Sequence, residues 1–142
     1  MLSLLHASLL HERLQETEKT AARIHAPDWL VRELNTPKMR LEVQFRARIR
    51  ANLESFSGFV VLLNNPHPTG ASPYKGGLRF NPQVTLDILT VLAMEMTDKC
   101  ALAVLPFGGG KAGIAFDPSL YSEEDRRKIT EAFTDELLKH NL

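Results

Sequence analysis

The sequence predicts an α/β fold: a three-layer α/β/α domain with a mixed, mostly parallel sheet and an N-terminal helical segment. Three observations predict this class. Helical periodicity stands at both ends of the chain, over about residues 6–24 and again after Ser122. Residues 38–50 alternate strictly between apolar and polar side chains, which is the two-residue period of a strand. An apolar helix over about residues 82–97 separates that strand from later ones, and this alternation is typical of layered α/β domains.

The N-terminal helix is predicted from one apolar stripe, made of Leu9, Leu10, Leu14, Ala21 and Ile24. A second, short helix is expected from Pro27 to Leu34, because proline is tolerated in a first turn. The leucine-rich start lacks a basic region and a small-residue cleavage site, so we do not interpret it as a secretion signal. We therefore assign residues 1–36 to a helical segment and residues 37–142 to a substrate-binding and oligomerisation α/β domain.

The alternating strand has one apolar face and one face rich in arginine, and the arginines fit either a solvated surface or a subunit contact. After it, a turn is predicted at Ser55–Gly58, a buried strand at Phe59–Leu63 and a loop at Asn64–Pro73.

The second half begins with a helix that we expect Asn81 to cap and Pro82 to open. This helix is apolar almost all round to Thr97, so it is expected to be buried. Two further strands are predicted, at Ala101–Leu105 and at Ile114–Phe116. The last helix begins at Ser122 with three acidic residues in its first turn, which suits the helix dipole.

Composition narrows the class of partner. The 17 basic and 17 acidic side chains cancel, so no global field favours nucleic acid or an anionic membrane, and we expect neither as a partner. The single cysteine, Cys100, cannot form an internal disulfide and is expected to be a core residue in a reducing compartment, by default the cytoplasm. The five histidines lack metal-ligand spacing, so no metal site is predicted.

Three lysines stand in unusual surroundings. Lys111 ends a glycine run between apolar segments, and glycine allows a ligand to approach the chain closely. A lysine amine partly removed from water can act as a base or nucleophile near neutral pH. If Lys75 and Lys99 converge on the same cleft, they supply two positive charges that suit a small dianion. Each segment alone is a weak motif, because a lysine beside glycine is usually part of a surface turn.

Two phosphate-binding motifs are excluded. A P-loop requires glycine where Leu105 stands, and serine or threonine where Ala112 follows the lysine. A dinucleotide fingerprint requires a helix after its last glycine, whereas Gly113 is followed by an apolar segment predicted to be a strand.

Taken together and in order, three blocks resemble the N-terminal domain of the glutamate, leucine, phenylalanine and valine dehydrogenase family. The resemblance runs from about Ala26 to the end of the chain. Its blocks are Lys75-Gly76-Gly77-Leu78-Arg79-Phe80, Met96-Thr97-Asp98-Lys99 and Pro106-Phe107-Gly108-Gly109-Gly110-Lys111-Ala112-Gly113. One block alone would be weak evidence, but three at the right separations are specific.

The resemblance implies reversible oxidative deamination of an amino acid to a 2-oxo acid and ammonia, with NAD or NADP. By this resemblance Lys111 is the catalytic lysine, whose neutral amine helps activate the water that attacks the imino intermediate. Lys99 holds the substrate's α-carboxylate, and Met96 lines the same pocket. Lys75 pairs with a side-chain carboxylate, which implies glutamate and 2-oxoglutarate as the substrate pair. The residues expected to form the pocket wall are Gly76, Gly77, Gly109 and Gly110.

The chain also departs from the family pattern. Asp98 stands where relatives often carry an aromatic residue, so it either weakens carboxylate binding at Lys99 or points outward. The loop from Asn65 to Tyr74 is longer than usual. The resemblance places the catalytic aspartate and the nucleotide-binding domain beyond Leu142, so we expect this chain alone to be inactive. NAD or NADP would then be bound by a domain in a longer protein or in a second chain, within a homo-oligomer.

An alternative is a free-standing, non-catalytic module of the same family that serves oligomerisation or binds a small acid. The three lysines argue against this alternative, because a non-catalytic domain does not require a lysine in a glycine-lined pocket. An unrelated phosphate-binding α/β domain is the third hypothesis.

Overall fold

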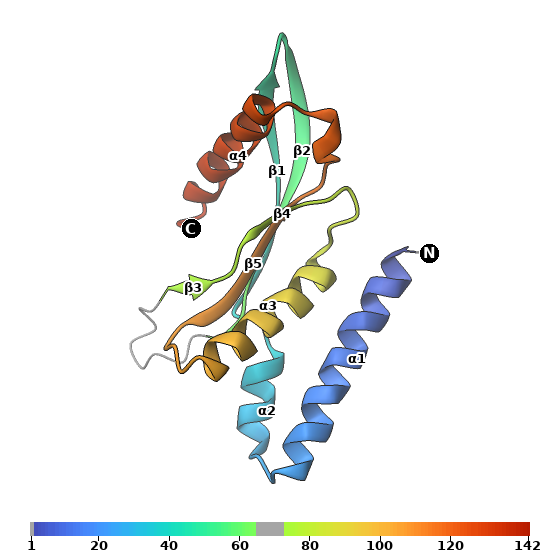
Figure 1. Cartoon of the computed structure of the whole chain (residues 1–142), viewed down its shortest axis with the longest axis vertical. Coiled ribbons are helices and arrows are strands. Elements are labelled where there is room, and N and C mark those ends of the chain that lie inside the picture. The colour runs from blue at the N-terminus through green and yellow to red at the C-terminus, as the bar shows by residue number, and fades with distance from the viewer. Residues whose placement is uncertain (1, 65–72) are drawn as a thin grey trace.

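The computed structural model describes residues 2–64 and 73–142 of the chain. It contains both helices and strands, as expected for an α/β domain (Figure 1). In chain order they are α1 (Leu2–Arg23), α2 (Asp28–Asn35), β1 (Met39–Ile49), β2 (Asn52–Leu62), β3 (Tyr74–Lys75), β4 (Leu78–Phe80), α3 (Leu86–Leu102), β5 (Gly108–Ile114), the 3-10 helix η1 (Pro118–Leu120) and α4 (Glu123–Leu138).

The five strands form one mixed sheet in the order β1-β2-β5, with β3 and β4 both paired to β5. The sheet is mixed, as predicted, but the prediction that it is mostly parallel is wrong. The long β1–β2 ladder and the β2–β5 ladder are antiparallel, and only the short strands β3 and β4 run parallel to β5. The reason is the two-residue link between β1 and β2, since strands joined by a tight turn can only be antiparallel.

Helices cover both faces of the sheet, which gives the predicted three layers. On one face α4 contributes Ile129 and Phe133 to a core shared with β1 and β2. On the other face α3 contributes Leu89 and Ala93 to a second core, and Leu10 of α1 packs against that core. Figure 1 shows α4 beside the β1–β2 hairpin and α3 on the opposite side of β5, with α1 beyond it.

The predicted alternation of β1 is confirmed, because its apolar side chains from Val43 to Ile49 are buried while the intervening polar ones are exposed. Of the outer arginines, Arg40 forms an ion pair with Asp87 in the first turn of α3, at 2.6 Å. Cys100 is buried, with 2% of its surface exposed, as expected for a core cysteine.

The turn predicted at Ser55–Gly58 is wrong, since these residues lie inside β2. The chain reverses instead at Arg50, whose φ is +55°, a conformation that favours glycine or asparagine. Gly58 is required for packing, because a Cβ there would lie 2.3 Å from Cε2 of Phe133 in α4.

The limits of α3 differ from the prediction at both ends. Asn81 does not cap the helix: its side chain accepts from the backbone N–H of Gln83, and Thr85 is the N-cap. The strand predicted at Ala101–Leu105 is wrong, because α3 continues to Leu102 and closes at Val104, whose φ is +54°. Helices commonly end at a left-handed residue, usually glycine, and valine there gives no sequence signal.

The strand predicted at Ile114–Phe116 is also displaced, since β5 begins at Gly108 and ends at Ile114. The glycine run therefore belongs to β5, which lies between β2 and β3 in the sheet. Of the loop predicted at Asn64–Pro73, residues 65–72 lie outside the described residues. Among residues 2–64 and 73–142, no helix is long and apolar enough to cross a membrane.

The start of α4 is confirmed as a capping box. The Ser122 hydroxyl accepts from the backbone N–H of Asp125, and the Asp125 carboxylate accepts from the backbone N–H and the hydroxyl of Ser122. Asp125 is buried and also contacts Arg50 of the hairpin at 3.3 Å. Hydrogen bonds from Ser122, followed by the Arg50 charge, hold the pKa of Asp125 below its ordinary value of 3.8.

Ser122→Ala is expected to lower the free energy of unfolding by about 0.5–2 kcal/mol near neutral pH, because it removes the cap of α4. A carboxyl whose pKa is depressed by folding contributes stability above its unfolded pKa and loses it as pH falls through the folded value. The difference between wild type and Ser122→Ala should therefore shrink below about pH 4. Denaturant unfolding at several pH values measures it, with the exposed Ser55→Ala as control. A difference that stays constant with pH would exclude the ionised Asp125 as the partner.

Candidate functional site

The candidate site lies at the edge of β5 where β3 and β4 pair with it. Lys75 of β3 lies opposite Gly109, and Leu78 of β4 lies opposite Ala112. Between the two short strands, the Gly77 carbonyl accepts from the backbone N–H of Ala112 at 3.0 Å. The first and third sequence blocks are thus adjacent strands of one sheet.

Lys75 reaches from β3 to helix α3. Its Nζ lies 3.4 Å from Sδ of Met96, which is half-buried. Lys99 follows Met96 by three residues on α3, and residues at this spacing share a helix face. The second block therefore places Lys99 on the side of α3 that Lys75 contacts.

Lys111 of β5 lies next to the Gly76–Gly77 link. A Cβ built on Gly77 would be 3.5 Å from Nζ of Lys111, so the amine lies beside this glycine. Lys111 is half-buried, whereas Lys75 and Lys99 are exposed. The predicted site residues are therefore brought together in two contacts, Lys75 with Met96 and Lys111 with Gly77.

Lys99 has a partner that the sequence reasoning missed. Its Nζ lies 3.7 Å from Oε2 of Glu95, one helical turn earlier, and both side chains are about half exposed. The Glu-Lys spacing of four residues is a recognisable signal for such a pair. An anion that binds Lys99 therefore does so beside the Glu95 carboxylate.

The glycines around the site have different roles. A Cβ on Gly109 would lie 2.2 Å from the Ala93 carbonyl oxygen, and one on Gly76 would lie 1.8 Å from the Gly110 carbonyl oxygen. These two positions allow α3 and β3 to approach β5, so they are required by the fold. Gly77 differs, because among the described residues its Cβ would meet only the amine of Lys111.

Asp98, the departure from the family pattern, points to α1. Its Oδ2 lies 2.5 Å from Nη2 of Arg13. Of the two alternatives that the sequence left open, the structure thus supports an outward-pointing carboxylate. No sequence signal connects Arg13 to Asp98, because they are 85 positions apart.

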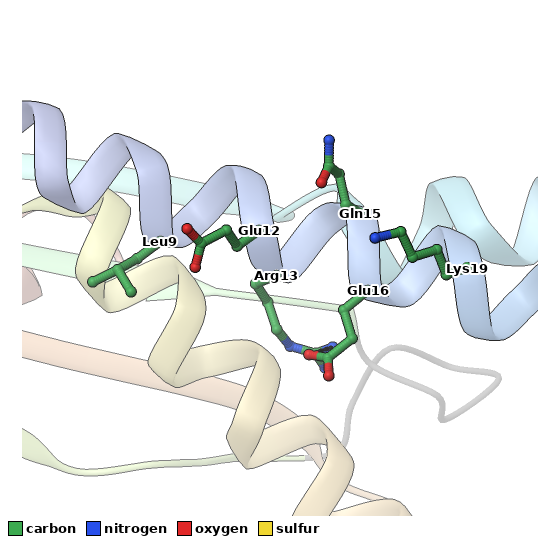
Figure 2. A pocket seen from close by; sticks show the side chains of 6 residues that line it. All are labelled: Leu9, Glu12, Arg13, Gln15, Glu16 and Lys19. Atoms are coloured by element: carbon green, nitrogen blue, oxygen red, sulfur yellow. Dashed lines mark ion pairs between the residues drawn. The ribbon is translucent and has the colours of Figure 1, made fainter.

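The described surface hollows lie elsewhere. One of about 520 Å³ follows α1 and is lined by its own side chains, among them Arg13 and Glu16 (Figure 2). Another, of about 420 Å³, is apolar and lies between α2 and the turn after α3. Lys75, Lys99 and Lys111 line none of the described hollows. Residues 2–64 and 73–142 also contain no cluster of three or more side chains suited to a metal ion.

The comparison with protein families places this α/β domain in an oxidoreductase family. The family model for the Glu/Leu/Phe/Val dehydrogenase dimerisation domain matches residues 37–141, and the chain belongs to this family.

The similar curated proteins are glutamate dehydrogenases. The NAD-specific glutamate dehydrogenase A of Halobacterium salinarum is 40% identical over 109 residues, which cover 76% of this chain and 24% of that protein. The glutamate dehydrogenase of Thermotoga maritima is 34% identical over 131 residues, covering 92% of this chain and 30% of that protein. The chain thus spans about a quarter to a third of the length of these relatives.

Solved structures of the same class have the same fold. The crystal structure of glutamate dehydrogenase from Peptoniphilus asaccharolyticus superposes with a TM-score of 0.82 at 25% identity, covering 92% of this chain and 32% of that one. The hetero-hexameric glutamate dehydrogenase of Thermus thermophilus gives 0.78 at 29% identity, covering 94% and 31%.

Proposed function

We propose that residues 37–142 form the substrate-binding wall of an NAD(P)-dependent glutamate dehydrogenase that deaminates glutamate reversibly to 2-oxoglutarate and ammonia. The observation that carries this proposal is the convergence of the three lysine blocks at one edge of the sheet. Lys75 contacts Met96 on α3, and Lys111 lies beside Gly77, two residues after Lys75. The similarity to glutamate dehydrogenases of both NAD and NADP specificity supports this substrate class.

Within this proposal each lysine has one role. Lys75 binds the side-chain carboxylate of glutamate, and Lys99 binds the α-carboxylate after exchanging its Glu95 partner. Lys111, half-buried beside Gly77, acts on the reacting carbon as the base that activates water. Two ammonium groups on one wall suit a dicarboxylate, since each carboxylate gains a charge-assisted hydrogen bond.

The residues described do not fit a nicotinamide nucleotide. Such a cofactor is typically held by a glycine turn between a strand and the N-terminus of a helix. Gly108–Gly110 lie inside β5, where a Cβ at Gly108 or Gly109 would overlap the backbone of Asn64 or of α3. We therefore infer that NAD or NADP binds a domain that is not part of this chain, and that the chain alone does not turn over substrate.

We further infer that the chain acts within a homo-oligomer. The matching family model describes a dimerisation domain. β1 forms one edge of the sheet, and a long open edge strand is a ready template for pairing with another chain. Large apolar side chains are exposed as well, among them Trp29, Leu102 and Val104. The same features suit the alternative of a non-catalytic association module.

Lys75→Leu tests the substrate assignment. In the active assembly, KM for glutamate is expected to rise about 10- to 100-fold, because a hydrogen bond to a charged group contributes about 1.5–3 kcal/mol. KM for an apolar amino acid such as norvaline should fall or stay the same. Steady-state kinetics on both substrates measure this, and Lys128→Leu on α4 serves as the matched control. Equal losses on both substrates would refute the role of Lys75.

A further inference from the structure

We propose that Arg13 of α1 is a positioning residue for the lysine site, because it neutralises Asp98 and fixes the end of α3 that carries Lys99. This inference rests on the proposed function. It concerns Asp98, at which the second block departs from the family pattern.

The charge of Asp98 is the starting point. Asp98 immediately precedes Lys99, so an unpaired carboxylate there would oppose the approach of a substrate carboxylate. Asp98 instead lies 2.5 Å from Nη2 of Arg13, within charge-assisted hydrogen-bond distance. The guanidinium therefore offsets the field that Asp98 would otherwise exert on an anion at Lys99.

Arg13 is held in place by α1 itself. Its Nη1 donates to Thr17 Oγ1 at 3.1 Å and lies 3.8 Å from Oε2 of Glu16. Figure 2 shows the Arg13 and Glu16 side chains leaving α1 on the same side and meeting. The Arg13 side chain is only 18% exposed, whereas that of Asp98 is 53% exposed. The arginine is therefore the fixed partner, and the orientation of Asp98 follows it.

The location of the pair connects α1 to the site. Leu10 and Leu14 of α1 pack against the core that contains Leu89 and Ala93 of α3. The Arg13–Asp98 pair continues this contact beyond Ala93 to the segment of α3 that carries Lys99. The N-terminal helical segment thus changes the electrostatic potential at a site that it does not line.

The test is binding of glutarate, an unreactive five-carbon dicarboxylate, to the natural assembly by titration calorimetry. The variants are Arg13→Gln, Asp98→Asn and the double variant. Arg13→Gln is expected to raise Kd for glutarate about two- to fivefold at low ionic strength and less at high ionic strength. Asp98→Asn should bind at least as tightly as wild type, and the double variant should match Asp98→Asn.

The matched control is Arg127→Gln, which removes the same charge from an exposed ion pair with Glu131 on α4. Unchanged glutarate binding by Arg13→Gln, or a double variant as weak as Arg13→Gln, would overturn the inference. If the Arg13–Asp98 pair had only a structural role, both single variants would lower the unfolding temperature without a salt-dependent change in Kd. If wild type binds no glutarate, the proposed function itself fails, so the two failures are distinguishable.

Discussion

Lys111→Ala is expected to reduce turnover of glutamate by a factor of about 10² to 10⁴, the range in which a positioned acid or base contributes to catalysis. The fold should tolerate the change, because Lys111 is only half-buried in β5. Its amine lies beside Gly77, which has no side chain that packs against it. Steady-state kinetics of the active assembly measure turnover, and thermal unfolding reports on the fold.

Lys111→Arg separates proton transfer from charge. Arginine keeps the positive charge but does not lose its proton in proteins, so it should be nearly as inactive as Lys111→Ala. Glutarate binding by Lys111→Arg should remain close to that of wild type. Lys128→Ala on α4, where Lys128 pairs with Glu124, is the control. Full activity of Lys111→Ala would exclude this residue from catalysis and favour the non-catalytic module.

Gly109→Ala is expected to lower the free energy of unfolding by about 1–3 kcal/mol, the usual cost of overpacking a well-packed core. Its Cβ would lie 2.2 Å from the carbonyl oxygen of Ala93 and 2.6 Å from the backbone nitrogen of Thr97. Both atoms belong to the backbone of α3, so no side-chain rotation can relieve the overlap. Denaturant unfolding of the chain measures the loss.

Gly77→Ala is the matched control for this prediction, since it adds the same methyl group two residues after Lys75. In the part of the chain that the structure describes, only the flexible amine of Lys111 would lie within contact distance, at 3.5 Å. Stability should change by no more than about 0.5 kcal/mol. Glutarate binding should weaken, because the methyl group occupies space beside Lys111. Equal destabilisation by the two substitutions would show that Gly77 also serves the fold.

Periodicity and caps were sufficient for several elements. The alternation of residues 38–50 correctly predicted both β1 and its buried face, because apolar side chains at a two-residue period can bury only one side of a strand. Ser122 correctly marked the start of α4, since a serine followed by acidic residues satisfies the free N–H groups of a first turn by local contacts alone.

Turns and the glycine strand were not predictable in the same way. Arg50 and Val104 adopt positive φ without being glycine, so nothing in the local sequence indicates that the chain turns there. The strand was predicted to begin only after the glycines, at Ile114, and glycine is indeed rare in strands. The glycine run forms β5 because α3 and β3 approach the strand too closely for a side chain, which is visible only once the layers are assembled.

The sequence by itself determined the family, the identity of the three lysines and their membership in three ordered blocks, because these are properties of residue type and spacing. Only the tertiary structure decided which residues meet: Lys75 with Met96, Lys111 with Gly77, and Arg13 with Asp98. The physical reason is that electrostatic and packing contacts depend on distance in space, and these partners are 21, 34 and 85 positions apart in the chain.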